Sequence, residues 1–252
     1  MWDKPDMLNG VANLLIAAAL LVGAYGILHY ASRLPVFSLR EVHVTSPLAH
    51  VTLDQIETVV KHQLKGNFFT LDLEGARTGF EKLSWARKAN ARRVWPDRLE
   101  VAIEEHVPLA RWGSTALVNS HGELFTAAFD GALPLFVGPE ASAKEIAIQY
   151  GYFQRSLSAI GRVPAQVQVS ARRAWQIKLD NGLIIELGRE SMETRLDRFV
   201  AVFERTVGRL NRRLNYVDLR YPNGFALRIP EFDHQPRNPS PRRDDAGNTK
   251  RG

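Results

Sequence analysis

The chain has 252 residues, of which 45% are hydrophobic and 24% are charged, the balance of a globular protein with room for more than one core. It contains no cysteine, which excludes disulfides, thiolate metal sites and a cysteine nucleophile. The formal net charge of +6 suits nucleic acid, an acidic lipid surface or an acidic protein, so charge alone does not choose a partner.

The N-terminal part of the chain predicts a transmembrane helix over residues 7–32. This stretch contains no Asp, Glu, Lys or Arg, and its middle reads LLIAAALLVGAYGIL. At about 1.5 Å per residue, a helix of this length crosses a hydrocarbon layer of about 30 Å. A cleaved signal peptide is disfavoured, because its apolar part usually has about 7 to 15 residues. Lys4 on one side and Arg33 with Arg40 on the other leave the orientation open.

Residues 35–106 predict the order strand, helix, helix, strand, strand. The run LREVHV, after Phe37, has the composition of a strand. A capping box from Thr52 to Gln55 opens the first helix, and Asp72 opens the second. The runs ARKANARRVW and RLEVAIEEH then predict two strands joined by a turn at Pro96–Asp97.

Residues 107–232 predict a second domain of short strands with two or three helices. The strands are ALVNS, ELFTA, LPLFV, AQVQVS, a hairpin turning at Asn181–Gly182 and a final hairpin turning at Pro222–Gly224. Ser142 to Glu145 predicts a capping box for one helix, and a second helix carries apolar residues from Met192 to Leu210. Residues 233–252 have few apolar side chains and predict a disordered tail. The predicted fold class is therefore α+β.

No pattern in the sequence predicts catalysis. The seven histidines are scattered, without the H-E-x-x-H spacing that places two imidazoles on one metal. Glu104 and Glu105 are neighbours on a predicted strand, so their side chains point to opposite faces and do not share a scissile bond. The G-x-S-x-G, G-x-x-x-x-G-K and G-x-G-x-x-G motifs are absent. We therefore expect no enzyme activity, catalytic residue, metal, cofactor or small-molecule substrate.

A dense basic cluster follows Trp85 and extends past Trp95. It comprises Arg87, Lys88, Arg92, Arg93 and Arg98. Such a cluster is typical of a nucleic-acid surface, of a docking surface for an acidic protein, or of a strand face that is merely solvated. The membrane anchor disfavours the first interpretation, so we expect no nucleic-acid partner. The sequence leaves the other two open.

Five segments carry a resemblance to a known family: GNFFTLDL, WPDRLEV, EEHVPLARW, ARRAWQIKLDNG and YVDLRYPNG. Together they resemble the FtsQ/DivIB family of bacterial cell division proteins, in order from Pro35 to Ile229. The resemblance implies a cytoplasmic N-terminus at residues 1–6, one span of the cell inner membrane, and a periplasmic part with a POTRA domain at 35–106 and a β-domain at 107–232. It also implies a non-catalytic scaffold at the division septum, which links early and late divisome proteins, binds FtsB and FtsL, and has FtsK among its partners.

The resemblance and the strand pattern together predict two partner-binding surfaces. The first is the open edge of the final hairpin, to which an FtsB-type partner adds a strand; it comprises Arg173, Arg220, Tyr221, Asn223, Gly224, Phe225, Leu227 and Ile229. The second is a recruitment surface on the POTRA domain, comprising Lys88, Ala91, Arg92, Arg93 and Glu105. Tyr221 is the expected aromatic anchor. The alternative is a core Tyr221, because strand alternation places it on one face with Val217 and Leu219.

Two other functions are weighed against the division scaffold. One is a membrane-anchored POTRA chaperone for envelope protein assembly, and the other is an envelope enzyme. We expect such a chaperone to carry a β-barrel or several POTRA repeats, and no catalytic group can be nominated for the enzyme. The single span and the lone POTRA-like unit therefore favour the division scaffold.

Overall fold

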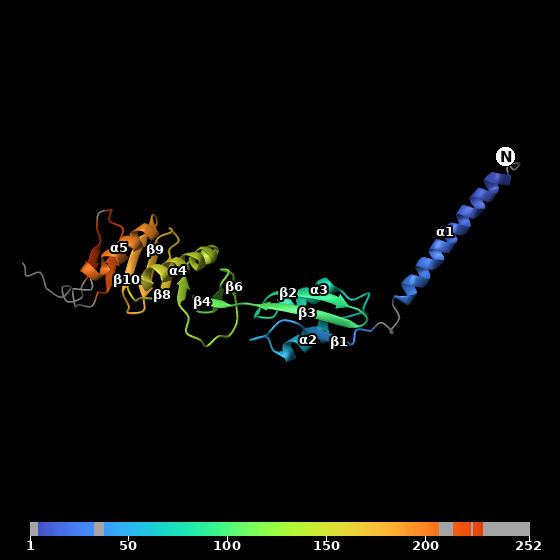
Figure 1. The fold of residues 1–252 in the computed structure, drawn as a ribbon, viewed down its shortest axis with the longest axis horizontal. Helices are drawn as coiled ribbons and strands as arrows, with labels where there is room; N and C mark the ends of the chain where they lie inside the picture. The colour runs from blue at the N-terminus through green and yellow to red at the C-terminus, as the bar shows by residue number, and fades with distance from the viewer. Residues whose placement is uncertain (1–4, 33–37, 207–213, 223, 229–252) are drawn as a thin grey trace, which may run out of the picture. The chain divides into compact units, whose positions relative to one another are not determined.

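The computed structural model describes residues 5–32, 38–206, 214–222 and 224–228, and it confirms the α+β class (Figure 1). Helix α1 (Pro5–Ala31) contains a stretch, Asn9–Ala31, that is long and apolar enough to cross a membrane. The predicted tail at 233–252, the helical residues 207–210 and the site residues Asn223 and Ile229 lie outside the described residues.

The chain divides into two compact units, Met1–Pro108 with Phe125–Asp130, and Leu109–Leu124 with Gly131–Gly252. The first unit includes residues 125–130, which interrupt the second unit in the sequence and whose aromatic rings contact the first. Phe125 stacks on His106 with centroids 4.1 Å apart and meets Trp85 edge-on at 5.5 Å. Phe129 lies 6.1 Å from the same Trp85 ring. These aromatic pairs bury large apolar surfaces and hold the segment on the first unit.

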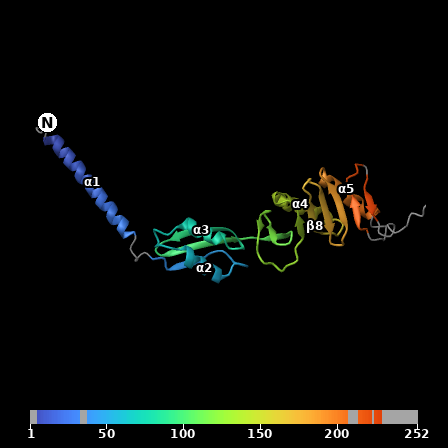
Figure 2. The same cartoon turned by 180° about the vertical axis from the view of Figure 1, so that it is seen from behind.

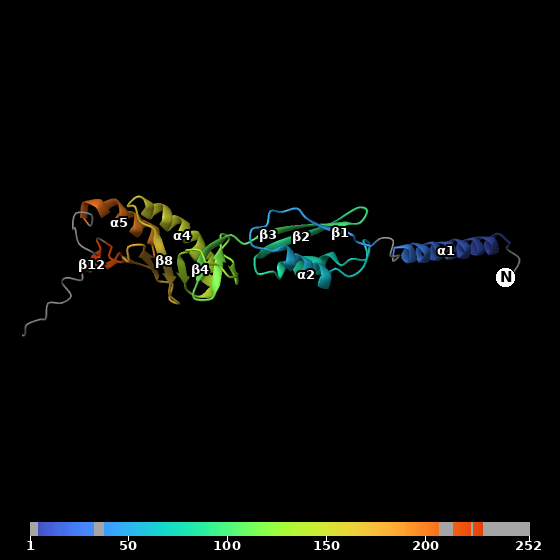
Figure 3. The ribbon, with the colours of Figure 1, turned by 90° about the horizontal axis from the view of Figure 1, so that it is seen from below.

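The first unit has a three-stranded sheet with helices on one face, as Figure 3 shows. The sheet order is β1 (Glu41–Val44), β3 (Arg98–Glu105), β2 (Ala86–Val94), with β1 parallel and β2 antiparallel to β3. Helices α2 (Leu53–Gln63) and α3 (Leu73–Glu81) cover it with buried Ile56 and Phe80. The predicted order of strand, helix, helix, strand, strand is confirmed.

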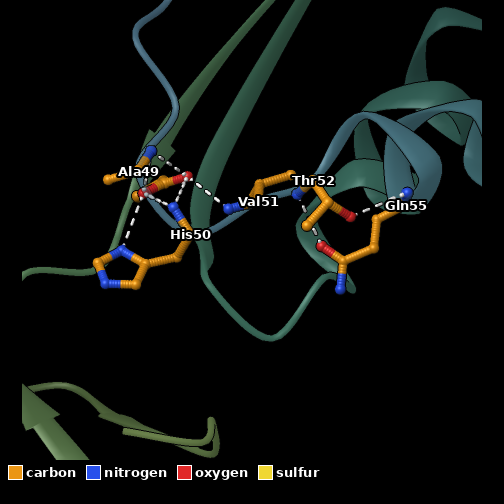
Figure 4. Close-up of polar contacts among 6 residues, drawn as sticks. Ala49, His50, Val51, Thr52 and Gln55 are labelled. Atoms are coloured by element: carbon orange, nitrogen blue, oxygen red, sulfur yellow. Dashed lines mark hydrogen bonds and ion pairs between the residues drawn. The ribbon is translucent and has the colours of Figure 1, made fainter.

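The helices of the first unit begin where the sequence places them. The Gln55 N–H donates to Thr52 Oγ1 at 3.4 Å, and the Thr52 N–H donates to Gln55 Oε1 at 3.1 Å, so the predicted capping box is confirmed (Figure 4). Asp72 accepts hydrogen bonds from the first amides of α3. Each cap satisfies backbone donors that have no partner inside the helix.

One carboxylate fixes the loop that leads into α2. The amides of Ala49, His50 and Val51 donate to Glu105 at the end of β3, with N–O distances of 3.1, 3.1 and 2.8 Å (Figure 4). The Glu105 side chain is only 10% exposed, and His50 Nδ1 lies 3.2 Å from it. Burial raises the pKa of Glu105, but the three backbone donors outweigh it, so this pKa lies below its ordinary value.

The second unit contains a nine-stranded mixed sheet, apart from one residue each of β4 and β6, Pro108 and Phe125, which belong to the first unit. Its order is β12 (Ala226–Arg228), β11 (Tyr216–Asp218), β10 (Ile184–Gly188), β9 (Trp175–Leu179), β8 (Pro164–Val169), β7 (Leu135–Val137), β4 (Pro108–Trp112), β5 (Ala116–Asn119), β6 (Leu124–Phe125). Helices α4 (Ala143–Ser158) and α5 (Met192–Thr206) lie along one face, visible in Figures 2 and 3. Phe153, Trp175 and Phe199 are among the largest side chains of this core.

The predicted capping box at Ser142 is wrong. Residues Glu140–Ser142 form a short 3-10 helix, and the Ser142 hydroxyl donates to the Pro139 carbonyl at 2.6 Å instead of accepting from α4. By contrast, the predicted turn at Asn181–Gly182 is confirmed, since Gly182 has a φ of 87°, which a residue without Cβ adopts freely.

Replacing Glu105 by Gln tests whether this carboxylate holds the loop of residues 49–51 in place. The amide keeps the size of the side chain but turns a charged acceptor into one neutral oxygen and a donor group. We expect unfolding of the detergent-solubilised chain by urea to show a loss of about 1 to 3 kcal/mol at neutral pH. Because the folded pKa is depressed, the wild-type advantage is full above about pH 5 and disappears as pH falls through the folded pKa.

Glu57→Gln is the matched control, since this carboxylate of α2 is exposed and pairs with Lys61, which is exposed as well, at 2.7 Å. It should change stability little. Two outcomes would contradict this role of Glu105. One is a Glu105→Gln protein as stable as wild type at neutral pH, and the other is a loss of unfolding free energy that stays constant as pH falls.

Candidate partner-binding surfaces

Strand β12 is an edge strand of the second sheet. It pairs antiparallel with β11, with Val217 opposite Leu227 and Asp218 opposite Ala226. Within the described ranges, no further strand pairs with its outer side. An edge of this kind presents unpaired N–H and C=O groups that another chain can use.

The backbone of Leu227 points toward this open edge. On β11, the Leu219 N–H donates to the Glu186 carbonyl of β10 at 2.9 Å. Backbone groups alternate sides along a strand, so Val217, two residues earlier, also faces β10 and not β12. Leu227 is the register partner of Val217, and partners in an antiparallel pair either bond to each other or both point away. The N–H and C=O of Leu227 therefore face outward.

Tyr221 lies just beyond β11 and is 55% exposed. Strand alternation does not reach it because β11 ends at Asp218, although Val217 and Leu219 are buried. The alternative of a core Tyr221 is wrong. An open hollow of about 500 Å³ adjoins the ring; it is lined by Tyr221, Pro222, Gly224, Phe225 and Ala226.

Phe225 and Leu227 turn their side chains toward the core. The Phe225 ring meets Phe199 of α5 edge-on, with centroids 5.7 Å apart. Both Phe225 and Leu227 are partly buried against the core cluster, whereas Ala226 and Arg228 between and beyond them are exposed. Of the predicted apolar residues that the structure describes, Tyr221 alone presents a mostly exposed ring. Phe225 and Leu227 instead hold β12 against the second unit.

Both predicted arginines have carboxylate partners within the chain. Arg220 Nη2 lies 2.6 Å from Asp218 Oδ2, and its Nε donates to Asp218 Oδ1 at 2.9 Å. The Arg220 side chain lowers the pKa of Asp218 although burial opposes this, and Asp218 raises the pKa of Arg220. Arg173 Nη2 lies 2.6 Å from Glu145 Oε2. Both guanidinium groups remain exposed, so an acidic group of a partner can approach either one.

Sequence reasoning missed Arg198 of α5. Its Nη2 donates to the Tyr221 carbonyl at 3.0 Å, and its Nη1 donates to the Pro222 carbonyl. These two bonds fix the segment between β11 and β12 and so the position of Tyr221. Arg198 is one of several charged residues on α5, and no spacing or motif in the sequence distinguishes it.

The five predicted residues of the POTRA surface do not form one continuous surface. Lys88 and Arg92 lie on the helix-free face of the sheet, where Arg92 Nε donates to Glu100 at 2.7 Å. An open hollow of about 300 Å³ on this face is lined by Thr45, Asn90, Arg92, Glu100 and Ala102. Lys88 and Arg92 are therefore the two predicted residues on the helix-free face, although Arg93 is exposed as well.

The other three residues support the fold. Ala91 and Arg93 alternate onto the helix-covered face, where Ala91 is half-buried and Arg93 Nη2 donates to the Leu71 carbonyl at 2.6 Å. Glu105 is occupied by the loop amides of residues 49–51. No group of three or more His, Asp and Glu in the described part of the chain is placed to hold a metal ion.

Two models of known families match the chain, one on each side of a boundary between residues 106 and 110. A model described as "POTRA domain, FtsQ-type" matches residues 37–106, and one described as "Cell division protein FtsQ/DivIB, C-terminal" matches residues 110–220. The cell division protein FtsQ of Nitrosospira multiformis is 48% identical over 233 residues, which are 90% of this chain and 99% of the relative.

Two further relatives named cell division protein FtsQ show how far the similarity extends. The one from Burkholderia pseudomallei is 43% identical over 235 residues, 90% of this chain and 94% of its own. The one from Bordetella pertussis is 32% identical over 258 aligned positions, 91% of this chain and 93% of its own. With both units matched by family models and nearly the whole length shared with these relatives, the chain belongs to the FtsQ/DivIB family of cell division proteins.

Proposed function

We propose that the chain is a non-catalytic scaffold of the divisome, anchored in the cell inner membrane by α1 with its C-terminus in the periplasm. It links early and late division proteins at the septum and binds the FtsB/FtsL complex. The observation that carries this proposal is the open edge of β12 beside the exposed ring of Tyr221.

The FtsB-type partner adds an extended segment to β12. The outward N–H and C=O of Leu227 supply backbone hydrogen bonds, which give affinity without regard to sequence. The Tyr221 ring and the adjoining hollow receive one side chain of the segment, and aromatic anchors of this kind dominate binding energy. Arg220 and Arg173 select acidic residues of the partner, and Gly224, with the undescribed Asn223 and Ile229, completes the proposed site.

Two substitutions separate the backbone part of this surface from its side-chain part. Leu227→Pro removes the outward N–H, so binding to purified FtsB/FtsL should be lost, while Leu227→Ala keeps the N–H and should retain most of it. Tyr221→Ala should weaken binding about 30-fold or more at a stability cost below about 1 kcal/mol, because the ring is exposed. Titration calorimetry of the full chain in detergent measures the affinity of each variant, and scanning calorimetry measures its stability.

Ile148→Ala, at an exposed apolar position on α4, is the control for the loss of surface hydrophobicity. It should bind like wild type. Wild-type affinity of folded Tyr221→Ala and Leu227→Pro proteins would rule out strand addition at β12.

Lys88 and Arg92, on the helix-free face of the first sheet, form the core of a recruitment surface for an acidic division partner such as FtsK. Their helix-free face carries the hollow next to Glu100, and clustered cations steer an acidic partner in a salt-dependent way. In this proposal Ala91, Arg93 and Glu105 act by holding the strand and loop in place.

The double variant Lys88→Ser, Arg92→Ser should lower the fraction of cells with septal fluorescence several-fold when the full chain carries a fluorescent fusion. The double variant Lys61→Ser, Lys82→Ser removes the same charge from α2 and from the residue that follows α3, and it should leave localisation unchanged. Equal localisation of both folded variants means that Lys88 and Arg92 recruit nothing.

Topology is tested by reporters at the two ends of the chain. An enzyme that is active only outside the cytoplasm should be active when fused after Gly252 and inactive when fused before Met1. The physical basis is the single helix, Asn9–Ala31, that suits a membrane span among the described residues. A stable C-terminal fusion without activity would reverse the proposed orientation.

A further inference from the structure

The turn between β2 and β3, residues 95–97, exposes a large aromatic ring. Trp95 is 76% exposed, although tryptophan is among the side chains that gain most from leaving water. We propose that this hairpin tip docks on the anionic phospholipid surface of the membrane that α1 crosses, with the Trp95 ring at the level of the headgroups. The proposal rests on the proposed function in one respect, that α1 spans the membrane.

The chain itself keeps the hairpin tip near the membrane. The Arg40 N–H donates to the Asp97 carbonyl at 2.9 Å, so the tip lies at the end of the sheet where the chain enters the first unit. Ser32 ends the described part of the α1 segment, and eight peptide units separate it from Arg40. Eight units span at most about 29 Å, whatever path they follow. The headgroup layer is therefore within reach of the tip.

The residues around the tip suit a lipid interface. Trp has an apolar ring and one N–H donor, and it concentrates where hydrocarbon meets water. Arg40 and Arg98 beside the tip pair through Nε with Asp97 and Glu41, at 3.9 and 3.0 Å. Both guanidinium groups stay exposed, so their remaining donors can bind lipid phosphates. Within residues 40–41 and 92–100, four arginines stand against three carboxylates, which gives a modest preference for anionic lipid.

A second apolar side chain belongs to the same end of the unit. Phe69 is 48% exposed in the loop between α2 and α3. The Arg93 guanidinium of β2 donates to the Leu71 carbonyl at 2.6 Å, which ties this loop to the hairpin. A single exposed ring is common on protein surfaces, but two at the membrane-tethered end of one unit are typical of an interfacial anchor.

The absence of native cysteine allows a direct depth measurement. A nitroxide is attached to Asp97→Cys in the full chain, reconstituted in vesicles of phosphatidylethanolamine and phosphatidylglycerol. Collision rates with oxygen and with a water-soluble nickel chelate are then compared. Leu53→Cys is the matched site, 74% exposed in the same unit. Leu53 follows the loop bound by Glu105, at the other end of β3, a strand whose eight residues span about 23 Å.

We expect nickel collisions at position 97 to be at least threefold lower than at position 53, and Trp95→Ser to restore them without changing the melting temperature. Vesicles of phosphatidylcholine alone should reduce the protection. Equal nickel collisions at positions 97 and 53 would overturn the proposal, as would protection that arises only after a division protein is added. The measurement needs no partner, so a failure of FtsB/FtsL binding leaves it unaffected, and its own failure leaves the scaffold intact.

Discussion

The Glu105 carboxylate orders one end of the first unit. It accepts hydrogen bonds from the amides of residues 49–51, and residue 51 directly precedes Thr52, the N-cap of α2. The same carboxylate lies 3.2 Å from the His50 ring, which stacks on Trp85 with centroids 3.8 Å apart. The Trp85 ring in turn contacts the Phe125 ring edge-on. A buried charge with several donors is stable, whereas the same charge with none is costly, so loop, helix start and ring stack form together.

Local chemistry made most of the fold predictable. Thr52 and Asp72 cap helices through residues two or three positions away, and such signals are contained in the sequence itself. Ser142 has the same local signal and fails, because it ends a 3-10 helix with a helical ψ of −3°, whereas Thr52 has the extended ψ of 154° that an N-cap residue needs. The hairpin at Pro96–Asp97 and the turn at Gly182 were equally local.

The candidate site was less predictable because its geometry depends on distant contacts. Position in the chain was enough to predict an edge strand near residue 227. The exposure of Tyr221 depends on where β11 ends and on Arg198, which is 23 positions earlier in the sequence. The role of Glu105 depends on a loop more than 50 residues away. Strand alternation also divides Arg92 from Arg93, a separation that a count of basic residues does not show.

Residues 125–130 belong to the first unit although part of the second unit precedes them in the sequence, and this affects the order in which the two units fold. During synthesis from the N-terminus, the strands β1 to β3 and the helices α1 to α3 have all been made once residue 108 has been added. The Trp85 and His106 rings still lack Phe125 and Phe129 at that moment. The first unit is complete only after β4, β5 and β6 have followed. Maturation of the two units is therefore interleaved in time, and a chain cut at residue 106 ends with an uncovered aromatic surface.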